Sequence, residues 1–172
     1  MLLDLEARIA AAIPPLDAEA RARAVAQDWN LSLLDPTDPD ERLVLIRLAH
    51  PALDDAIERG DDELIVDGLV MNPRLHLVIH EVVATQIIDG DPPKMFETAA
   101  RLIADGRDRH DVLHMLGSTV SGQIWSATHD GRPFDRAAHI AALAALPGSW
   151  DAMARPAGDQ HGRRRARRPR RR

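Results

Sequence analysis

Along most of the chain, apolar residues recur at intervals of three or four positions, which places them on one face of an α-helix. Prolines, glycines and capping aspartates interrupt this pattern and mark where helices begin and end. The pattern predicts helices at residues 1–13, 17–29, 40–49, 51–58, 73–88, 93–105, 109–128 and 135–146. The predicted fold is therefore mainly α, a compact and bundle-like helical domain.

One short passage, residues 64–70, has the pattern of a β-hairpin. Asp67-Gly68 separates two runs of apolar residues, and this dipeptide favours the tight turn that joins two antiparallel strands. A two-stranded hairpin is only marginally stable by itself in water. We therefore expect this hairpin to lie against the helices.

With 172 residues, 45% of them hydrophobic, the chain is long enough to form one buried core. We expect a single helical domain at residues 1–152, in which residues 1–40 form a helical N-terminal extension packed on the rest. The formal net charge of −5 is unevenly distributed, because residues 163–172 contain eight arginines and no acid. Removing these eight of the 22 basic groups leaves 14 against 27 acidic groups, a net charge of −13. Residues 153–172 are expected to be disordered, because the arginines repel one another and have nothing to bury.

The composition excludes several classes of function. Cysteine is absent, so disulfides, thiolate metal sites and cysteine nucleophiles are excluded. The sequence contains no run of about 18 apolar residues, the length that a helix needs to span a membrane. Acids lie near the start, where a secretory signal needs basic residues, and they favour a cytoplasmic protein. There is no glycine-rich phosphate loop, dinucleotide-binding fingerprint or serine nucleophile elbow. The acidic body and the 3% aromatic content also disfavour DNA-binding and base-stacking surfaces.

Four of the eight histidines carry the most chemical information, because they form two pairs with helical spacing. His76 and His80 are four positions apart, and so are His110 and His114. On a helix, residues at this spacing lie one above the other, so that each pair presents two imidazoles in one direction. Helices bind divalent metal ions with this arrangement.

The two helices that carry these pairs are predicted to pack with the pairs facing each other. His76 and His80 continue into an apolar row, whereas His110 and His114 continue to the small residues Gly117 and Ser121, which let another helix approach closely. Four neutral nitrogens without a thiolate suit Zn first, followed by Fe, Ni or Cu. Four bound imidazoles would give a closed structural site, and three with one water would give an open catalytic site.

Two carboxylates lie beside the histidines in the sequence. Asp111 belongs to the pattern His-Asp-x-x-His, which is close to the His-Glu-x-x-His of zinc proteases, where the carboxylate accepts a proton from the metal-bound water. Asp111 is therefore the candidate catalytic residue, although its side chain is one methylene shorter than that of Glu. Glu81 is expected to orient a ligand histidine from outside the ligand set, or to bind a second metal.

The remaining histidines and one tryptophan are given ordinary structural roles. His50 precedes a proline and is expected to be a turn residue. His129, His139 and His161 are expected at the surface. Trp125 is expected in the core, with the wall of a pocket beside the histidines as the alternative.

The sequence also resembles a bacterial family called domain of unknown function 1841, over roughly residues 45–150. The segments that carry the resemblance are Asn72-Pro73-Arg74-Leu75-His76-Leu77-Val78-Ile79-His80, Gln86, Asp91-Pro92-Pro93, His110-Asp111-Val112-Leu113-His114 and Trp125. Members of that family similarly carry Asn-Pro-x-Leu-His-x-x-x-His followed by His-[Asp/Glu]-x-x-His. The resemblance implies no particular reaction. It supports the predicted metal site through the matching residues His76, His80, His110, Asp111 and His114.

The sequence therefore predicts a metal-binding helical protein and leaves open whether it is an enzyme. The alternative is a non-catalytic interaction or adaptor protein in which the histidines merely pack, and a third interpretation is a metal-dependent hydrolase that uses Asp111. The arginines at 163–172 would bind nucleic acid without sequence preference, bind an acidic protein surface, or form an extension without a role. No membrane partner is expected, and a homo-oligomer is compatible with the sequence.

Overall fold

The structure, a computed structural model, describes residues 2–66 and 69–154 of the chain. Within these residues it is mainly α-helical, with one two-stranded antiparallel sheet, which confirms the predicted fold class. None of the described helices is both long enough and apolar enough to cross a membrane. In chain order, the elements are α1 (Leu2–Ala12), α2 (Ala18–Ala26), the 3₁₀ turn η1 (Leu31–Leu33), α3 (Pro39–Leu48), α4 (Pro51–Arg59), β1 (Leu64–Val66), β2 (Leu69–Met71), α5 (Pro73–Asp89), α6 (Pro93–Ala104), α7 (Arg109–His129), α8 (Arg136–Ala144) and α9 (Gly148–Ala154).

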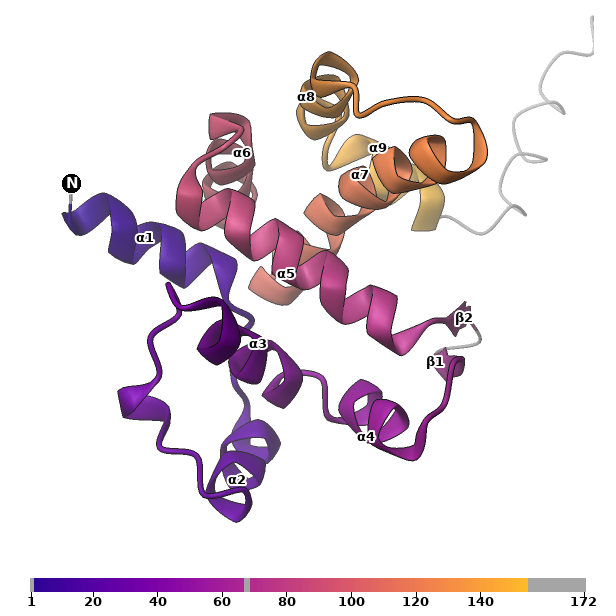
Figure 1. Cartoon of the computed structure of the whole chain (residues 1–172). Helices are drawn as coiled ribbons and strands as arrows, with labels where there is room; N and C mark the ends of the chain where they lie inside the picture. The colour runs from indigo at the N-terminus through magenta and orange to yellow at the C-terminus, as the bar shows by residue number, and fades with distance from the viewer. Residues whose placement is uncertain (1, 67–68, 155–172) are drawn as a thin grey trace, which may run out of the picture.

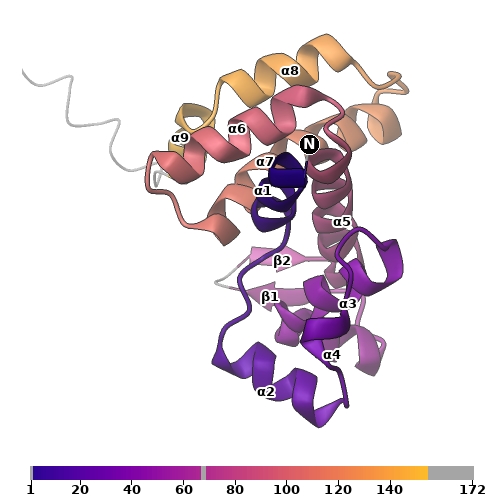
Figure 2. The ribbon, with the colours of Figure 1, turned by 90° about the vertical axis from the view of Figure 1, so that its left-hand side faces the viewer.

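Helix α5 lies at the centre of the molecule and contacts α1, α3, α4, α6 and α7 (Figure 1). Its Leu77, Val83 and Ile87 are almost completely buried. The view in Figure 2 shows α2, α3, α4 and the hairpin at one end of the molecule, and α6, α8 and α9 at the other. A site on α5 is therefore reached by side chains from both halves of the chain.

Local sequence signals fix where α5 and α7 begin. The Asn72 side chain accepts a hydrogen bond from the backbone N–H of Leu75, and Pro73 occupies the first turn of α5, where its missing N–H costs nothing. Asp108 caps α7 in the same way by accepting from the backbone N–H groups of His110 and Asp111. Each histidine pair consequently lies in or near the first turns of a well-capped helix.

Helices α5 and α7 approach each other closely at Gly117. A Cβ atom built on Gly117 would lie 2.9 Å from Cγ2 of Ile79 on α5, which is closer than real side-chain atoms approach. Only glycine fits this contact without displacing Ile79. The expectation that the small residues after His114 permit a close helix approach is confirmed at this position.

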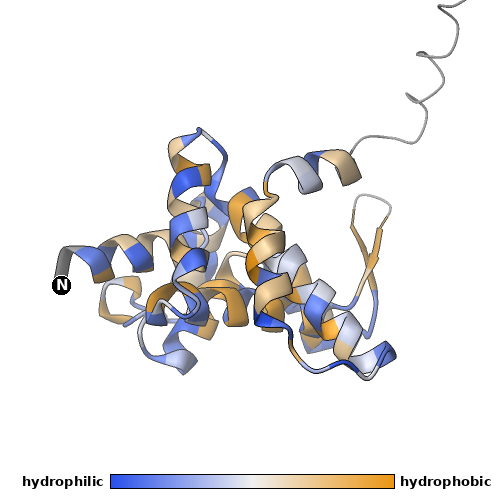
Figure 3. Ribbon diagram, turned by 90° about the horizontal axis from the view of Figure 1, so that it is seen from above, coloured by the Kyte–Doolittle hydropathy of each residue, from blue (hydrophilic) through white to orange (hydrophobic). Residues whose placement is uncertain are grey.

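The hairpin forms as predicted, with Leu64 opposite Met71, Ile65 opposite Val70 and Val66 opposite Leu69. Its predicted turn at Asp67-Gly68 lies outside the described residues. Leu64 and Met71 pack against the core, whereas Ile65, Leu69 and Val70 are exposed. Figure 3 shows both strands as hydrophobic along their described length. The hairpin therefore contacts the core through the Leu64–Met71 pair.

Two expectations about burial in the last third of the chain are wrong. Trp125 is 60% exposed and stacks on the ring of His129. No residue of α7 beyond Val120 is fully buried. His139 is completely buried rather than at the surface, since it occupies the same inward face of α8 as Leu143.

Smaller differences concern the ends of elements. The second helix ends at Ala26 and not near residue 29, and Asp28 follows with a positive φ of 59°. Helix α9 reaches Ala154, two residues into the predicted tail, and Arg107 holds its Asp151 at 2.7 Å. The rest of the predicted tail, with its arginines at 163–172 and His161, lies outside the described residues.

Candidate metal centre

Five histidines from three segments meet where α5, α7 and the α3–α4 junction come together. His76 and His80 come from α5 and His110 and His114 from α7, and their facing rings lie 5.2 Å apart for His76–His114 and 5.6 Å apart for His80–His110. The fifth ring, that of His50, lies 4.4 Å from His80 and 4.7 Å from His110, centroid to centroid. The two pairs therefore face each other as the sequence predicts.

His50 was expected to be a turn residue, and the structure confirms the turn but also places its ring in the histidine cluster. Pro51 holds His50 out of helical geometry, with φ −131° and ψ 60°, and the chain turns there from α3 into α4. The turn directs the ring of His50 inward, so that the residue is only 7% exposed. The sequence signal for this role is weak, because His50 has no histidine partner four positions away.

The backbone of α3 fixes the protonation of the His50 ring. Its Nδ1 lies 2.7 Å from the carbonyl oxygen of Ile46. A carbonyl can only accept, so Nδ1 carries the proton and Nε2 keeps a free lone pair. Histidines that bind metals are typically oriented by such a hydrogen bond from their other nitrogen.

The remaining ring nitrogens converge on one small volume. One nitrogen from each of His50, His76, His80 and His114 lies within 4.8 Å of the corresponding nitrogens of the other three. Nε2 of His76 is 3.1 Å from Nε2 of His80, and Nε2 of His114 is buried without a hydrogen-bond partner among the described residues. A buried nitrogen without a partner is costly. A metal ion at this point would remove that cost.

Burial keeps these imidazoles neutral. The pKa of His50 is lowered to about 3 and that of His114 to about 4, chiefly by removal from water and in part by the neighbouring rings. Burial also lowers the pKa values of His76, His80 and His110. At pH 7 the cluster therefore presents unprotonated nitrogens, which is the form that binds metal ions.

The predicted catalytic residue lies at the edge of the cluster. Asp111 is exposed on the first turn of α7, next to His110. Its negative charge, together with that of Asp108, opposes the lowering of the His110 pKa by burial. Its action as a proton acceptor stays a prediction.

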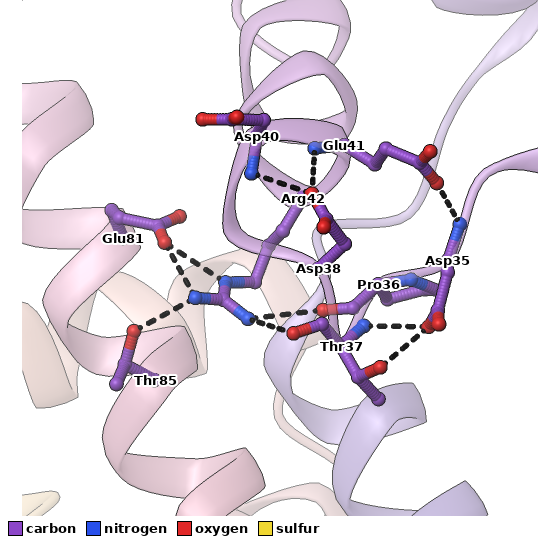
Figure 4. Close-up of polar contacts among 9 residues, drawn as sticks. All are labelled: Asp35, Pro36, Thr37, Asp38, Asp40, Glu41, Arg42, Glu81 and Thr85. Atoms are coloured by element: carbon purple, nitrogen blue, oxygen red, sulfur yellow. Dashed lines mark hydrogen bonds and ion pairs between the residues drawn. The ribbon is translucent and has the colours of Figure 1, made fainter.

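Glu81 lies next to His80 on α5 and is bound to a residue that the sequence analysis did not single out. Arg42 of α3 is 4% exposed and donates to Oε1 of Glu81 from Nη2 at 2.6 Å and from Nε at 3.0 Å (Figure 4). The same guanidinium donates to Thr85 and to the carbonyl oxygen of Pro36. Arg42 resembles a surface arginine in sequence, and only its tertiary contacts show that it joins α3 to α5.

The family model described as "Domain of unknown function (DUF1841)" matches residues 34–145. The resemblance in sequence covers roughly residues 45–150, so the matched range begins 11 residues before it and ends five residues before its end. The matched range contains all five clustered histidines. No curated protein and no solved structure matches the chain significantly.

Proposed function

Because the chain belongs to the family described as domain of unknown function 1841, whose description assigns no activity, we propose its function from the histidine cluster: the protein binds a divalent transition-metal ion. The ligands are His50, His76, His80 and His114. One observation carries the proposal, namely that a nitrogen of each of these residues lies within 4.8 Å of the other three in a largely buried setting. The predicted ligand set is thereby changed, because His50 takes the place of His110.

The chemistry of the ligands narrows the choice of metal. The nitrogens are neutral imidazoles, and no thiolate exists in the chain. Imidazole suits Zn, Fe, Ni and Cu, whereas Mg²⁺ and Ca²⁺ prefer oxygen ligands. For four such ligands and no others, tetrahedral Zn²⁺ is the first candidate.

Metal binding would also stabilise the tertiary structure. The ligands come from α5, from α7 and from the junction between α3 and α4, so one ion would join three segments. The binding site does not exist in the unfolded chain, and its binding free energy therefore adds to the free energy of unfolding.

The alternative function is that of an interaction protein whose histidines pack without a metal. The contact of 3.1 Å between Nε2 of His76 and Nε2 of His80 favours it, because one protonated and one unprotonated nitrogen at this distance form a hydrogen bond. A hydrolase that uses Asp111 is a further candidate and requires an open position on the metal.

Elemental analysis tests the proposal directly. The protein is purified without a nickel column, treated with a chelator and reloaded with Zn²⁺, Fe²⁺, Ni²⁺ or Cu²⁺. We expect about one ion per chain, a higher melting temperature with the ion than without it, and loss of both effects in His80→Ala. The exposed His129→Ala serves as the matched control and should behave like the wild type.

Circular dichroism of the metal-free variants separates loss of a ligand from loss of the fold. A wild-type protein that binds none of the four ions and melts at the same temperature in their presence would favour the packing alternative.

A further inference from the structure

We propose that the cavity between α3, α4 and the end of α2 binds a small, apolar α-amino acid. This proposal goes beyond metal binding and is independent of it, because none of the described histidines lines the cavity. The three helices lie at the same end of the molecule (Figure 2), and α3 contacts both α2 and α4. The cavity has a volume of about 200 Å³. Pockets for drug-sized ligands hold roughly 300–1,000 Å³, so this one admits only a small molecule.

The residues that line the cavity from α3 and α4 have helical spacing. Val44, Arg47 and Leu48 are at positions i, i+3 and i+4 of α3, and Asp54 and Glu58 are four positions apart on α4. Residues at these spacings lie on one face of a helix. Helix α3 therefore lines the cavity with two apolar side chains and a guanidinium, and α4 lines it with two carboxylates.

Trp29 lines the cavity from the segment that follows α2. Asp28 before it has a φ of 59°, a left-handed conformation that Asp adopts more readily than most residues with a side chain. The backbone N–H of Trp29 donates to the carbonyl oxygen of Ala24 at 2.8 Å, which fixes the chain at the end of α2. Together with Val44 and the buried Leu48, the indole gives the cavity an apolar part that suits a hydrocarbon side chain.

The Asp54 carboxylate needs no ligand, because two arginines already satisfy it. Asp54 is 3% exposed and accepts hydrogen bonds from Nε of Arg47 and, at 3.0 Å, from Nη2 of Arg23. The bond to Asp54 holds the guanidinium of Arg47 at the cavity, while its terminal Nη groups donate to no other residue that the structure describes. Arg47 therefore keeps N–H donors for a ligand carboxylate, which a guanidinium binds strongly.

Glu58 is the second charged group at the cavity with unused hydrogen-bonding capacity. Its Oε1 lies 3.9 Å from Nη2 of Arg47, which is too far for a hydrogen bond. Within the described part of the chain, Glu58 accepts no side-chain hydrogen bond from any other residue. The cavity thus presents one cationic and one anionic group, close to each other and each able to bind a ligand.

An α-amino acid satisfies both groups at once. Its carboxylate and its ammonium group are attached to the same carbon, so the carboxylate can accept from Arg47 while the ammonium donates to Glu58. Its side chain then lies against the apolar part of the cavity. A simple amine or carboxylate would leave one of the two charged groups without a partner, and the charged ends of a peptide are too far apart to bind both.

Calorimetry on the full-length protein tests the proposal, with L-valine, L-leucine and L-phenylalanine as ligands. The protein is first freed of metal with a chelator, because amino acids themselves bind metal ions. The amino acid that binds best is then compared with its amine analogue, which lacks the carboxylate, and with its acid analogue, which lacks the ammonium group. For L-leucine these are isoamylamine and isocaproate. We expect both analogues to bind about tenfold more weakly, since each lacks one charge-assisted hydrogen bond.

Glu58→Gln removes the partner of the ammonium group and should lower the affinity for the amino acid about tenfold. In the same variant the preference for the amino acid over its acid analogue should disappear, whereas damage to the fold would weaken both. Glu97→Gln on α6 is the matched control, because the Glu97 side chain is 54% exposed and that of Glu58 is 58% exposed. Circular dichroism verifies that both variants are folded.

The proposal is overturned if none of the three amino acids binds at millimolar concentration, if an analogue binds as tightly as the amino acid, or if Glu58→Gln and Glu97→Gln bind it equally. Binding that occurs only after Zn²⁺ is added would place the amino acid on the metal ion and would overturn the proposal as well. A protein that binds the amino acid but no metal would overturn the proposed function alone, so the two failures are distinguishable.

Discussion

Arg42 of α3 donates to Oε1 of Glu81 on α5 at 2.6 Å, and this ion pair lies one residue away from His80. The Arg42 side chain is 5% exposed and that of Glu81 is 25% exposed. Because α3 leads directly to His50, the pair joins the segment that carries His50 to the helix that carries His76 and His80. Arg42 and Glu81 thereby help to hold the cluster together without belonging to it.

Replacement of Glu81 by Gln should therefore destabilise the protein and weaken metal binding without removal of a ligand. The change leaves the Arg42 charge buried without its counter-ion. We expect the free energy of unfolding to fall by about 3 kcal/mol. This is the lower end of the range for breaking a buried ion pair, because part of Glu81 reaches solvent. Urea denaturation measures the loss, and competition with a chelator measures the metal affinity.

Asp62→Asn is the matched control, since its pair with Arg74 is exposed and should contribute less than about 1 kcal/mol. Equal effects of Glu81→Gln and Asp62→Asn would show that the buried pair has no special role in stability.

Gly117→Val should push α5 and α7 apart where Gly117 faces Ile79. Even the first added carbon meets Cγ2 of Ile79 at 2.9 Å, and Ile79 is β-branched and cannot move aside easily. We expect overpacking to lower the free energy of unfolding by roughly 1–3 kcal/mol and to lower the metal affinity. Gly122→Val on the same helix, where a Cβ meets nothing within 4 Å, should leave both quantities almost unchanged.

Much of the fold and four of the five clustered histidines can be predicted from sequence for the same physical reason. The pairs on α5 and α7 are local patterns, and their helices are bounded by residues with strong capping preferences, Asn72-Pro73 and Asp108. Their mutual orientation also follows, because the apolar row that contains His80 must face the core. Local spacing and burial together determine this part of the site.

The rest depends on tertiary contacts between distant segments. His50 reaches the cluster only because Pro51 turns the chain, and its nearest histidine in sequence is 26 positions away. Arg42 is followed by apolar residues and becomes buried only because Glu81 and the carbonyl of Pro36 satisfy its guanidinium. Trp125 shows the reverse case, since its hydrophobic ring remains exposed although the adjacent Ile124 packs against the core.

Asp111→Asn distinguishes a catalytic from a structural metal. Asp and Asn have nearly the same size, so metal content and melting temperature should stay the same, while proton acceptance by this side chain is lost. If the ion keeps an open position, any hydrolytic activity found by substrate screening should disappear in this variant. An Asp111→Asn variant that retains such activity would exclude Asp111 as the general base.

Deletion of residues 163–172 should leave the stability of the remaining chain almost unchanged, by well under about 1 kcal/mol, because solvated charges contribute little. The deletion changes the formal net charge from −5 to −13, since it removes eight arginines and no acid. If the arginines bind nucleic acid, the full chain should be retained on RNA or DNA at low salt, with an affinity that falls linearly on a log–log plot against salt. Retention of the truncated chain would instead place the binding surface elsewhere.

The stability of the metal-free protein should fall as the pH decreases below about 6.5, the pKa of an unperturbed histidine. In the folded protein, burial holds the pKa of His114 at about 4 and that of His50 at about 3. Between these limits the unfolded chain binds protons that the folded chain does not, so the stabilisation is complete above the unfolded pKa and is lost progressively toward pH 4. Each such histidine contributes a slope of at most about 1.4 kcal/mol per pH unit.

Urea denaturation at intervals between pH 7.5 and pH 5 in the presence of a chelator measures this slope, and it avoids the range where carboxylates titrate. His114→Gln should flatten it, because one proton-binding group is removed from the unfolded chain, whereas His129→Gln, at an exposed position, should not. With the metal bound, the part of the slope that His50 and His114 cause should stay the same over this range, because their nitrogens are already unprotonated in the folded, metal-free protein. A stability that is constant over this range would contradict the buried, neutral state of the cluster.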